Sequence, residues 1–529
     1  MIKQISTLII SALLLLSCQD HDHIFNIRSY GAKDDGKTIN TRAIQKAIDA
    51  CHQSGGGMVL VPPGEFVTGT IILKSNVNLH LQQGAVLLGS LDTADYRPDG
   101  YRHGLIYAFQ ARGVTISGEG EIYGRGTSFH LPEKAHIGGD FDRQYTRQGE
   151  QYLPAEPVPP DGPIGYLARP GMMIVLVQCE QVVIKDVTLR DSPEWTIRIG
   201  DCDDVLVHGI SILNNLLIPN SDGIHCTTSR NIRISDCDIR AGDDAIIVTG
   251  FGTEVGVSGD TDTELDYTSR EFGNKTGYAE NVAVSNCILQ SRSSGIRVGY
   301  GANSIRNCTF SNIVIYDSNR GIGIFSRDKG SIENILFSDI VIKNRLHSGH
   351  WWGNGEPIHV SAIKQDPSIP AGPVKNVRFR NVIAESETGI LIYGTEESPV
   401  IGLRLENVSL LIQPGSLEAA YGGNFDLRPV HTLELGIFRH DIPALYSQFT
   451  KDFVISDLQI IWGTDLPDYW TNAIYCTDFS GITIDGFTGA PAHSSLAAIE
   501  LVNGSGIFLT DLKPSTPGVQ MIKQKNVKE

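Results

Sequence analysis

The chain has 529 residues, and its acidic residues outnumber its basic ones by 60 to 43, which gives a formal net charge of −17 at pH 7. This charge disfavours a nucleic-acid partner, and an acidic polymer would need a local basic patch to bind. The 56 glycines and the modest hydrophobic content are more typical of a turn-rich β protein than of a helical one.

The first 17 residues are typical of a secretory signal, with Lys3 ahead of an apolar run that is too short to span a membrane as a helix. The run ends Leu15-Leu16-Ser17-Cys18, which resembles a bacterial lipobox, in which the cysteine becomes the lipidated first residue. We therefore expect a lipoprotein signal peptide over 1–17, a short tether over 18–24, and attachment to a membrane of the bacterial cell envelope through Cys18. A plain signal peptide followed by an unrelated cysteine is the alternative.

The other cysteines are scattered singly and form no CxxC pair, so the sequence supports neither a zinc site nor any other metal or cofactor. Cys237 and Cys287 occupy the same place in two similar segments, Ile-Ser-Asp-Cys and Val-Ser-Asn-Cys. We expect them to be buried, stacked thiols. Export would permit disulfides, but the sequence assigns none.

A single folded domain is expected over 25–529. Asn40 is placed to cap a helix that runs to Ala50, and its apolar face consists of Ala43, Ile44, Ala47 and Ile48. Because strands follow directly after Gly55-Gly56-Gly57, we expect this helix to cover the open end of a coiled β structure. Residues 125–169 lack periodicity and are expected to form a long loop.

A repeat of short strands begins at Val182. Apolar and polar residues alternate over 182–189, 205–212, 232–239 and 282–289, and turns rather than helices separate these segments. Asn231, Asn281 and Asn376 precede strands, as expected at coil corners where the side chain can bond the backbone. The pattern predicts an all-β fold, a right-handed parallel β-helix.

Three insertions interrupt the predicted coils, at 251–280, 345–356 and 413–450. The first contains the acidic run Asp260, Asp262, Glu264 and Asp266. This run could suggest calcium, but it lacks the turn glycine and closing glutamate of an EF loop, so a solvated acidic loop is favoured.

Two acidic segments, Asn220-Ser221-Asp222-Gly223-Ile224 and Gly242-Asp243-Asp244-Ala245-Ile246, carry the candidate chemistry. Asp222 and Asp244 are 22 residues apart, about one coil, so they should stack on neighbouring rungs with Asp243 beside them. Three converging carboxylates repel one another, which is costly for folding and indicates a catalytic site. Corner hydrogen bonding is the structural alternative.

Aligning the rungs on Asp222 and Asp244 gives columns of residues. Two positions after the aspartates, the column is an unbroken apolar stripe that we expect to lie in the core: Ile197, Ile224, Ile246, Ile296 and Ile322. One position further on are small residues that we expect to face outward as the floor of a groove: Thr196, Gly223, Ala245, Gly295 and Gly321. Three positions further on are Arg198, His225, Ile247, Arg297 and Gly323.

Such a groove would suit an extended anionic glycan, with Asn220, Arg198 and His225 among its contacts. Trp195 is a natural platform for stacking a sugar, although a partly buried packing role is an equal alternative. Glycoside hydrolysis uses one carboxylic acid to protonate the leaving oxygen and a second carboxylate to activate water or attack. Repulsion among the three aspartates would keep one of them protonated near neutral pH.

These residues resemble glycoside hydrolase family 28, the polygalacturonases. The resemblance covers most of the chain from Phe25 to about Leu410, and it rests on Gly118-Glu119-Gly120-Glu121-Ile122-Tyr123-Gly124, Ser192-Pro193-Glu194-Trp195 and the two aspartate segments. It implies a right-handed β-helix and an inverting hydrolase of a pectic, galacturonate-containing substrate. By this resemblance Asp243 is the general acid, and Asp222 and Asp244 hold and activate the water.

Two family motifs are absent. Ser293-Ser294-Gly295 stands where the polygalacturonases have Gly-His-Gly, and Gly323-Ile324-Phe325 stands where they have Arg-Ile-Lys. We therefore expect an exo-acting enzyme, or one that acts on a decorated or branched region of pectin. Arg297 and Arg320 are expected to replace the lost contacts to the substrate carboxylate, unless they neutralise Asp243 and Asp244 instead.

Two other function classes stay open. One is a non-catalytic glycan-binding β-helix lipoprotein, which the intact acidic triad disfavours. The other is a β-helical polysaccharide lyase, which needs calcium or a basic residue that abstracts a proton. No such constellation coincides with the aspartate column.

Overall fold

The computed structural model describes residues 23–96, 104–136, 141–152, 157–251 and 277–528. The signal peptide 1–17, Cys18, nearly all of the tether 18–24 and the acidic run Asp260–Asp266 lie outside these residues. Within the described ranges, no helix is long and apolar enough to cross a membrane.

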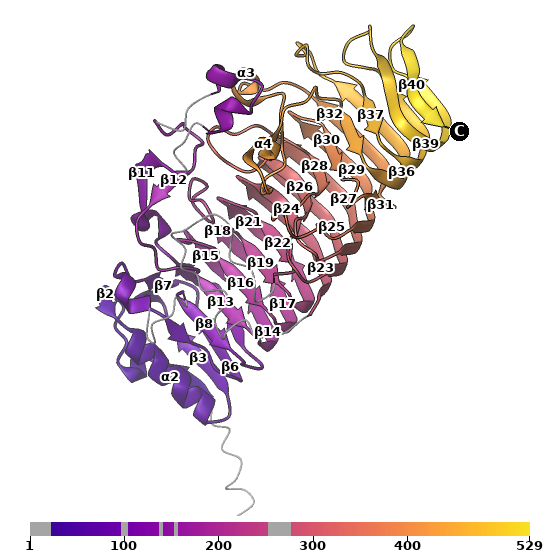
Figure 1. The fold of residues 1–529 in the computed structure, drawn as a ribbon. Helices are drawn as coiled ribbons and strands as arrows, with labels where there is room; N and C mark the ends of the chain where they lie inside the picture. The colour runs from indigo at the N-terminus through magenta and orange to yellow at the C-terminus, as the bar shows by residue number, and fades with distance from the viewer. Residues whose placement is uncertain (1–22, 97–103, 137–140, 153–156, 252–276, 529) are drawn as a thin grey trace, which may run out of the picture.

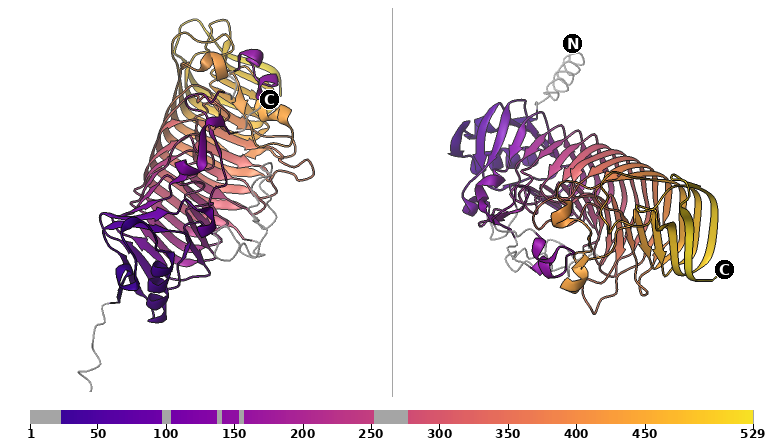
Figure 2. Two further views of the ribbon diagram at one scale, coloured as in Figure 1. Left: turned by 90° about the vertical axis from the view of Figure 1, so that its left-hand side faces the viewer. Right: turned by 90° about the horizontal axis from the view of Figure 1, so that it is seen from above.

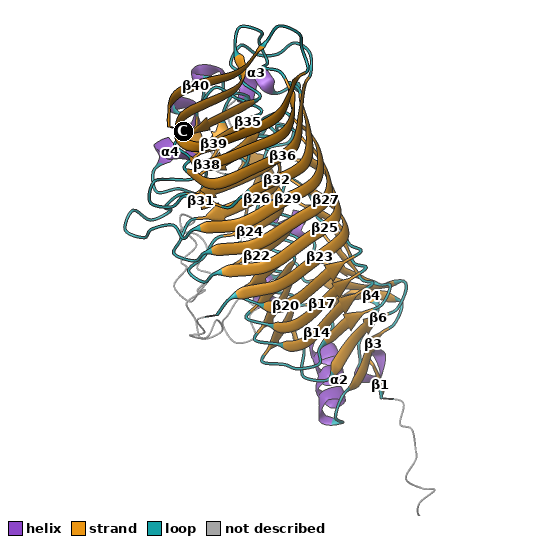
Figure 3. Ribbon diagram, turned by 90° about the vertical axis from the view of Figure 1, so that its right-hand side faces the viewer, coloured by secondary structure: helices purple, strands orange, loops and turns teal. Residues whose placement is uncertain are grey.

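The described chain winds into a parallel β-helix. Its main sheet has 36 strands, and each strand pairs in parallel with the equivalent strand one coil later. Figure 1 shows the coils stacked from the indigo N-terminal end to the yellow C-terminal end, and Figure 3 shows the same stack from the side. The all-β, right-handed parallel β-helix predicted from the repeats is confirmed.

The strands form three stacks along the helix axis. The first contains β1 Ile24–Asn26, β3 Gly57–Val61, β6 Val77–Leu81, β9 Thr115–Ser117, β14 Glu180–Lys185, β17 Asp203–His208 and β20 Arg230–Ser235. The second contains β2 Asp35–Ile39, β4 Gly64–Thr68, β7 Ala85–Gly89, β10 Glu121–Tyr123, β15 Thr188–Arg190, β18 Ser211–Leu213 and β21 Asp238–Ala241. From β23 onward, single long strands replace the separate strands of these two stacks.

The strands of this merged stack are β23 Ala279–Ser291, β25 Ile305–Ser318, β27 Ile332–Asn344, β29 Val374–Ser386, β31 Val400–Ile401, β32 Arg404–Ile412, β36 Thr450–Trp462, β38 Ser480–Gly489, β39 Ala497–Pro514 and β40 Gln520–Lys528. The third stack carries the candidate site. It contains β5 Ile71–Ile72, β8 Ile106–Phe109, β13 Ile174–Val177, β16 Ile197–Gly200, β19 Ile224–Thr227, β22 Ile246–Thr249, β24 Ser294–Gly299, β26 Arg320–Ser326, β28 Ile358–Ala362, β30 Ile390–Tyr393, β35 Leu445–Gln448 and β37 Ile474–Thr477.

Alternating side chains of these strands form one continuous core. In β23, Val282, Val284, Cys287 and Leu289 are buried, while Ala283 and Ile288 are exposed. Phe310 and Phe337 stack in the core with ring centroids 4.8 Å apart. Cys237 and Cys287 are buried free thiols, as expected.

Asparagine ladders mark the corners between strands. Asn231, Asn281 and Asn376 all have positive φ angles, a conformation that asparagine tolerates better than most residues. The Asn281 side chain donates to Oδ1 of Asn231 at 3.0 Å, one coil away. These residues lie at corners, as predicted, but the bonds of their side chains run to asparagines of neighbouring coils, including that from Asn376 to Asn334.

Helix α2, Thr41–Gln53, packs on the N-terminal coils beside β1, β3 and β5. Its buried face includes Ile44, Ala47 and Ile48, as predicted, and the helix runs three residues beyond the expected end at Ala50. Asn40 occupies the N-cap position, but its side chain bonds the backbone of Lys33 and Thr38 instead of the first helical turn.

The described parts of the 125–169 loop and of the 413–450 insertion lie on one side of the coils (Figure 2). The loop predicted over 125–169 contains an antiparallel pair, β11 His130–Ala135 and β12 Ile164–Tyr166. The 413–450 insertion contains α3 Glu418–Tyr421, α4 Leu433–Gly436 and the pair β33 Phe425–Asp426 and β34 Ile437–Phe438. These segments contact each other: the Trp351 indole donates to the carbonyl of Asp161, and the Arg147 amide donates to Oδ1 of Asn424 at 2.8 Å.

Candidate active site

The third stack brings the predicted columns into register. Ile197 pairs with Ile224, Ile224 with Ile246, Ile246 with Ile296, and Ile296 with Ile322, and all are fully buried. Arg198, His225, Ile247, Arg297 and Gly323 pair in the same order. The register deduced from the sequence is therefore confirmed.

Asp222, Asp243 and Asp244 lie together at the start of β19 and β22. The amide of Gly223 donates to the carbonyl of Asp244 at 2.9 Å, which places Asp222 and Asp244 on adjacent rungs. One carboxylate oxygen of Asp243 accepts from the amide of Asn220 at 3.2 Å, and the other accepts from the amide of Asp244 at 2.9 Å. Backbone amides from both aspartate segments thus orient the carboxylate of Asp243.

The three carboxyl groups differ in their surroundings. Burial, and then the charge of Asp244, raises the pKa of Asp243 to about 7. Burial, and then the charges of Asp243 and Asp244, also raises the pKa of Asp222 well above its usual range. A half-buried carboxyl group with a pKa near 7 can hold a proton at neutral pH and release it to a leaving group.

Asp244 is held as the partner of a cation. The Arg297 guanidinium donates from Nη1 to Oδ2 of Asp244 at 2.9 Å, and the amide of Ser294 donates to Oδ1 at 2.8 Å. Burial alone would lower the pKa of Arg297, but the neighbouring Asp244 outweighs it and raises the pKa above its ordinary value. The arginine therefore serves the aspartates, which is the alternative to its predicted role in binding the substrate.

His225 connects Asp222 to Trp195. Its Nδ1 lies 3.4 Å from Oδ2 of Asp222, its Nε2 lies 3.1 Å from the Thr249 hydroxyl, and its ring stacks on Trp195 with centroids 3.9 Å apart. Burial, and then the charges of Arg297 and Arg198, lowers the pKa of His225 well below its usual range, so the ring is neutral.

The prediction that His225 contacts the substrate is wrong, because its side chain is 0% exposed. It lies against the ring of Trp195, which is only half buried. Arg198, on the preceding rung, is 4% exposed and lies close to His225, so its predicted contact with substrate finds no support in its placement.

Arg169 and Glu194 are site residues that the sequence analysis missed as such. Arg169 donates from Nη2 to Oδ1 of Asn220 at 3.1 Å and from Nη1 to the carbonyl of Pro193 at 3.3 Å. Its Nε lies 3.6 Å from Oε2 of Glu194, and both side chains are buried. Through these bonds, Arg169 links the loop that carries Trp195 to the loop that carries Asn220. The side chain of Asn220 accepts one of the bonds. Glu194 was visible in the Ser-Pro-Glu-Trp motif, whereas Arg169 lay at the edge of the aperiodic loop.

The small residues one position after the aspartates do not form a groove floor. A Cβ atom added to Gly223 would lie 2.6 Å from Cγ2 of the core residue Ile239, and one added to Gly321 would lie 2.8 Å from Cγ2 of Ile342. Ala245 is part of the core. The prediction is wrong because the chain turns a corner at this position, and two successive residues then face inward.

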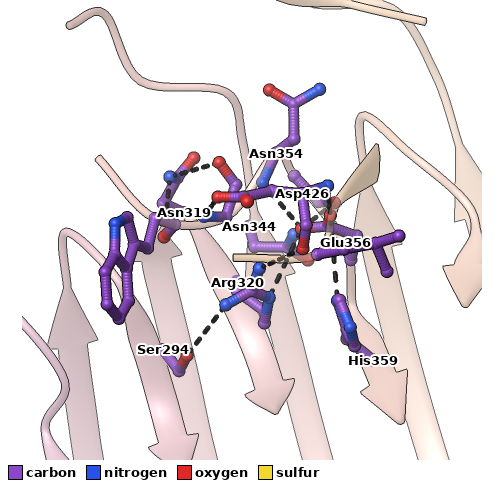
Figure 4. A network of polar contacts seen from close by, with 12 residues as sticks. Ser294, Asn319, Arg320, Asn344, Asn354, Glu356, His359 and Asp426 are labelled. Atoms are coloured by element: carbon purple, nitrogen blue, oxygen red, sulfur yellow. Dashed lines mark hydrogen bonds and ion pairs between the residues drawn. The ribbon is translucent and has the colours of Figure 1, made fainter. Parts of the chain in front are cut away.

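Arg320 lies in a buried polar network two rungs beyond Asp244 (Figure 4). Its side chain is 1% exposed, its Nε lies 3.5 Å from Oε2 of Glu356, and its Nη2 donates to the carbonyl of Asp426 at 3.1 Å. Oε1 of Glu356 in turn accepts from the amide of Asp426 at 2.9 Å.

This placement contradicts the expectation that Arg320 binds the substrate carboxylate. The arginine holds the insertions 345–356 and 413–450 against the coils. In the same strand, two residues after Gly323, the Phe325 ring occupies the space beside Gly323. The guanidinium carbon of Arg320 lies 4.9 Å from the centroid of this ring. The space that a long basic side chain would need at position 323 is therefore filled by an aromatic ring.

Among the described residues, no group of three or more His, Cys, Asp or Glu side chains is arranged to hold a metal ion. The aspartates are turned toward backbone amides and Arg297 instead. The acidic run at 260–266 is not part of the described residues.

Comparison with known proteins agrees with this geometry. Residues 168–420 match the model of "Glycosyl hydrolases family 28", and residues 24–84 match "Rhamnogalacturonase A/epimerase, pectate lyase-like". The exo-poly-alpha-D-galacturonosidase of Dickeya chrysanthemi is 31% identical over 44% of this chain and 43% of its own length, so that match spans less than half of the relative. A probable polygalacturonase of Vitis vinifera is 26% identical over 75% of each chain.

Among solved structures, the family 28 exopolygalacturonase of Yersinia enterocolitica superposes with a TM-score of 0.56 at 20% identity, over 95% of this chain and 78% of that one. The exopolygalacturonase of Thermotoga maritima superposes with a TM-score of 0.55 at 19% identity, over 84% and 92%. These likenesses establish the shared fold. The match to the family 28 model extends over residues 168–420, the segment that carries all three aspartates.

Proposed function

We propose that this chain is an exported pectin-degrading glycoside hydrolase that cleaves a galacturonate-containing glycan with inversion at the anomeric carbon. The observation that carries the proposal is the division of labour among the three aspartates. Asp243 has a pKa of about 7 and can donate a proton. Both carboxylate oxygens of Asp244, in contrast, accept hydrogen bonds, one from Arg297 and one from the amide of Ser294.

In the proposed reaction, Asp243 protonates the glycosidic oxygen as the bond to the anomeric carbon breaks. Asp222 and Asp244 hold a water molecule on the opposite face of the sugar, and Asp222 accepts a proton as the water attacks. Neutral His225, behind Asp222, fixes the orientation of that carboxyl group. Trp195, supported by the His225 ring, provides a flat surface for a sugar next to the bond that is cleaved.

Exo action is supported by the insertions that meet just beyond the aspartates. Nδ2 of Asn354 donates to the carbonyl of Asn424 at 2.8 Å, and the amide of Gly353 donates to Oδ2 of Asp426 at 2.6 Å. Two long segments are thus bonded together across the rungs that follow Asp244, where a continuing polymer would pass. The name of the Dickeya chrysanthemi relative, an exo-poly-alpha-D-galacturonosidase, points the same way.

The experiment is to incubate the protein with homogalacturonan and with short oligogalacturonides, and to separate the products over time. Exo action releases a single small product from the first minutes, whereas endo action gives a range of oligomers. Proton NMR at early times should show a product of inverted configuration. A retained anomer, or no hydrolysis of any galacturonate substrate, would refute the proposal.

A lipid anchor on Cys18 is also proposed, on the strength of the lipobox-like Leu-Leu-Ser-Cys sequence alone. It would hold the enzyme on a membrane of the bacterial cell envelope. Expression in a bacterial host with labelled palmitate should label the wild-type chain and leave Cys18→Ser unlabelled. An unlabelled, fully soluble wild-type protein would refute the anchor.

A further inference from the structure

A pocket of about 400 Å³ lies apart from the aspartates, at the C-terminal ends of β25, β27 and β29. Its floor is a column of outward side chains from three neighbouring coils: Tyr316 pairs with Lys343, and Lys343 pairs with Glu385. The start of the 413–450 insertion, from Gln413 to Gly415, forms one wall. The volume falls in the range of ordinary small-molecule sites.

Both cations that line this pocket are paired with carboxylates. Lys343 Nζ lies 3.0 Å from Oε1 of Glu385, which also accepts from the Gln413 side chain at 3.0 Å. Arg345, on the opposite wall, is paired with Asp317 at 2.6 Å and with Asp161 at 3.0 Å. With each cation already matched to a carboxylate, the pocket offers no excess positive charge to a uronate, and it favours a neutral, polar ligand.

The floor also offers an aromatic surface. Tyr316 is half buried, and its hydroxyl lies 3.4 Å from Oε1 of Gln290, so the ring is tethered at its polar end. Flat, partly exposed aromatic rings contact the C–H faces of sugars, while side-chain amides and carboxylates bond the hydroxyls. The Tyr316 ring, the Gln413 amide and the Glu385 carboxylate line a space of the right size for a sugar.

We propose that this pocket binds a neutral sugar unit of the glycan on which the enzyme acts. The proposal rests on the function proposed above and narrows it to a substrate that carries neutral sugars as well as galacturonate. The floor strands lead into β26, β28 and β30, which follow the Asp244 rung by two to four coils. At ~4.8 Å per coil, the pocket is displaced by roughly 10 to 20 Å along the axis, within reach of a branch of the same glycan.

Binding is measured by calorimetry on the full chain carrying Asp243→Asn, which suppresses hydrolysis. The probes are a galactan tetrasaccharide, an arabinan tetrasaccharide and trigalacturonate. We expect at least one neutral probe to bind, Tyr316→Ala to weaken it about tenfold, and Tyr316→Phe to retain it because the ring remains. Ile461→Ala, an exposed residue of the same outward column two coils beyond the floor, is the matched control and should bind normally.

Activity then tests the link to catalysis. In the active enzyme, Tyr316→Ala should lower kcat/KM on branched pectin and leave kcat/KM on trigalacturonate unchanged. Binding of neither neutral probe, or equal binding by Tyr316→Ala and wild type, would overturn the proposal even if pectin is hydrolysed. A neutral probe could instead bind in a way that depends on Tyr316 while no pectic substrate is hydrolysed. That result would support the sugar-binding pocket and refute the proposed function.

Discussion

Nη1 of Arg297 donates to Oδ2 of Asp244 across two adjacent rungs, at 2.9 Å, and this ion pair gives the three aspartates different roles. Asp244 has a cation of its own. Among the described residues, the backbone amides of Asn220 and Asp244 orient Asp243, and its pKa is raised to about 7. Carboxyl groups that look equivalent in the sequence thus become a partner of Arg297 and a proton donor in the fold.

The pH dependence of turnover should reflect Asp243. Its pKa is raised from the ordinary range to about 7, so the proton is present below pH 7 and is lost as the pH rises through that value. We expect kcat/KM on an oligogalacturonide to fall on the alkaline side with a midpoint near pH 7. In Asp243→Asn the residual activity should lack this alkaline limb. An unchanged limb in that variant would assign it to another group.

Removing the charge of Arg297 should shift the alkaline limb of the pH profile of kcat/KM. Arg297 lowers the pKa values of both Asp222 and Asp243, so Arg297→Gln should raise them and shift the alkaline midpoint to higher pH. Turnover should fall by about a hundredfold or more, because Asp244 loses its partner. Arg233→Gln, which breaks an exposed pair with Asp204, is the control and should change neither quantity. A lower kcat without any shift of the midpoint would contradict this account.

His225 should affect turnover more than substrate binding. His225→Phe keeps a ring beneath Trp195 but loses the nitrogen that lies 3.4 Å from Asp222. We therefore expect kcat to fall about tenfold or more with little change in KM, whereas His225→Ala should also raise KM because Trp195 loses its support. Steady-state kinetics on one oligogalacturonide separates the two effects. Wild-type kcat in His225→Phe would show that the nitrogen plays no part in orienting Asp222.

The Arg320 network should determine the stability of the insertions. Arg320→Met leaves Glu356, which is fully buried, without its cation, and breaking such a pair costs about 3–5 kcal/mol. We expect a lower melting temperature and faster proteolysis within 413–450. The double variant Arg320→Met/Glu356→Gln should recover much of the loss, since no unpaired charge remains. Equal instability of the single and double variants would mean that the packing of Arg320 matters more than its charge.

The sequence predicted the features that depend on repetition. Coil length, the isoleucine stripe and the stacking of Asp222 on Asp244 follow from a regular register, and the strand pairings agree with them. The small residues at Gly223 and Gly321 were misread because strict alternation fails at a corner, where both neighbours face the core.

The rest of the site could not be predicted from periodicity. Arg320 was placed at the correct column, but segments without any repeat fold over it and bury it. Arg169 contacts Asn220 from 51 positions away in the sequence, and only the folded chain brings the two together. The role of His225 was missed because its neighbour Trp195 covers it from a different coil.

The most direct test of the central claim is turnover of an oligogalacturonide by Asp222→Asn, Asp243→Asn and Asp244→Asn. Each substitution should lower kcat by about 10²-fold or more, because each removes the acid, the base or the group that holds the water. Melting temperatures of Asp222→Asn and Asp243→Asn should stay at or above that of the wild type, since clustered carboxylates repel one another. Asp244→Asn should melt at a lower temperature, because it leaves the buried Arg297 without its partner. Near-wild-type kcat in any two of these variants would contradict the assignment of this cluster as the active site.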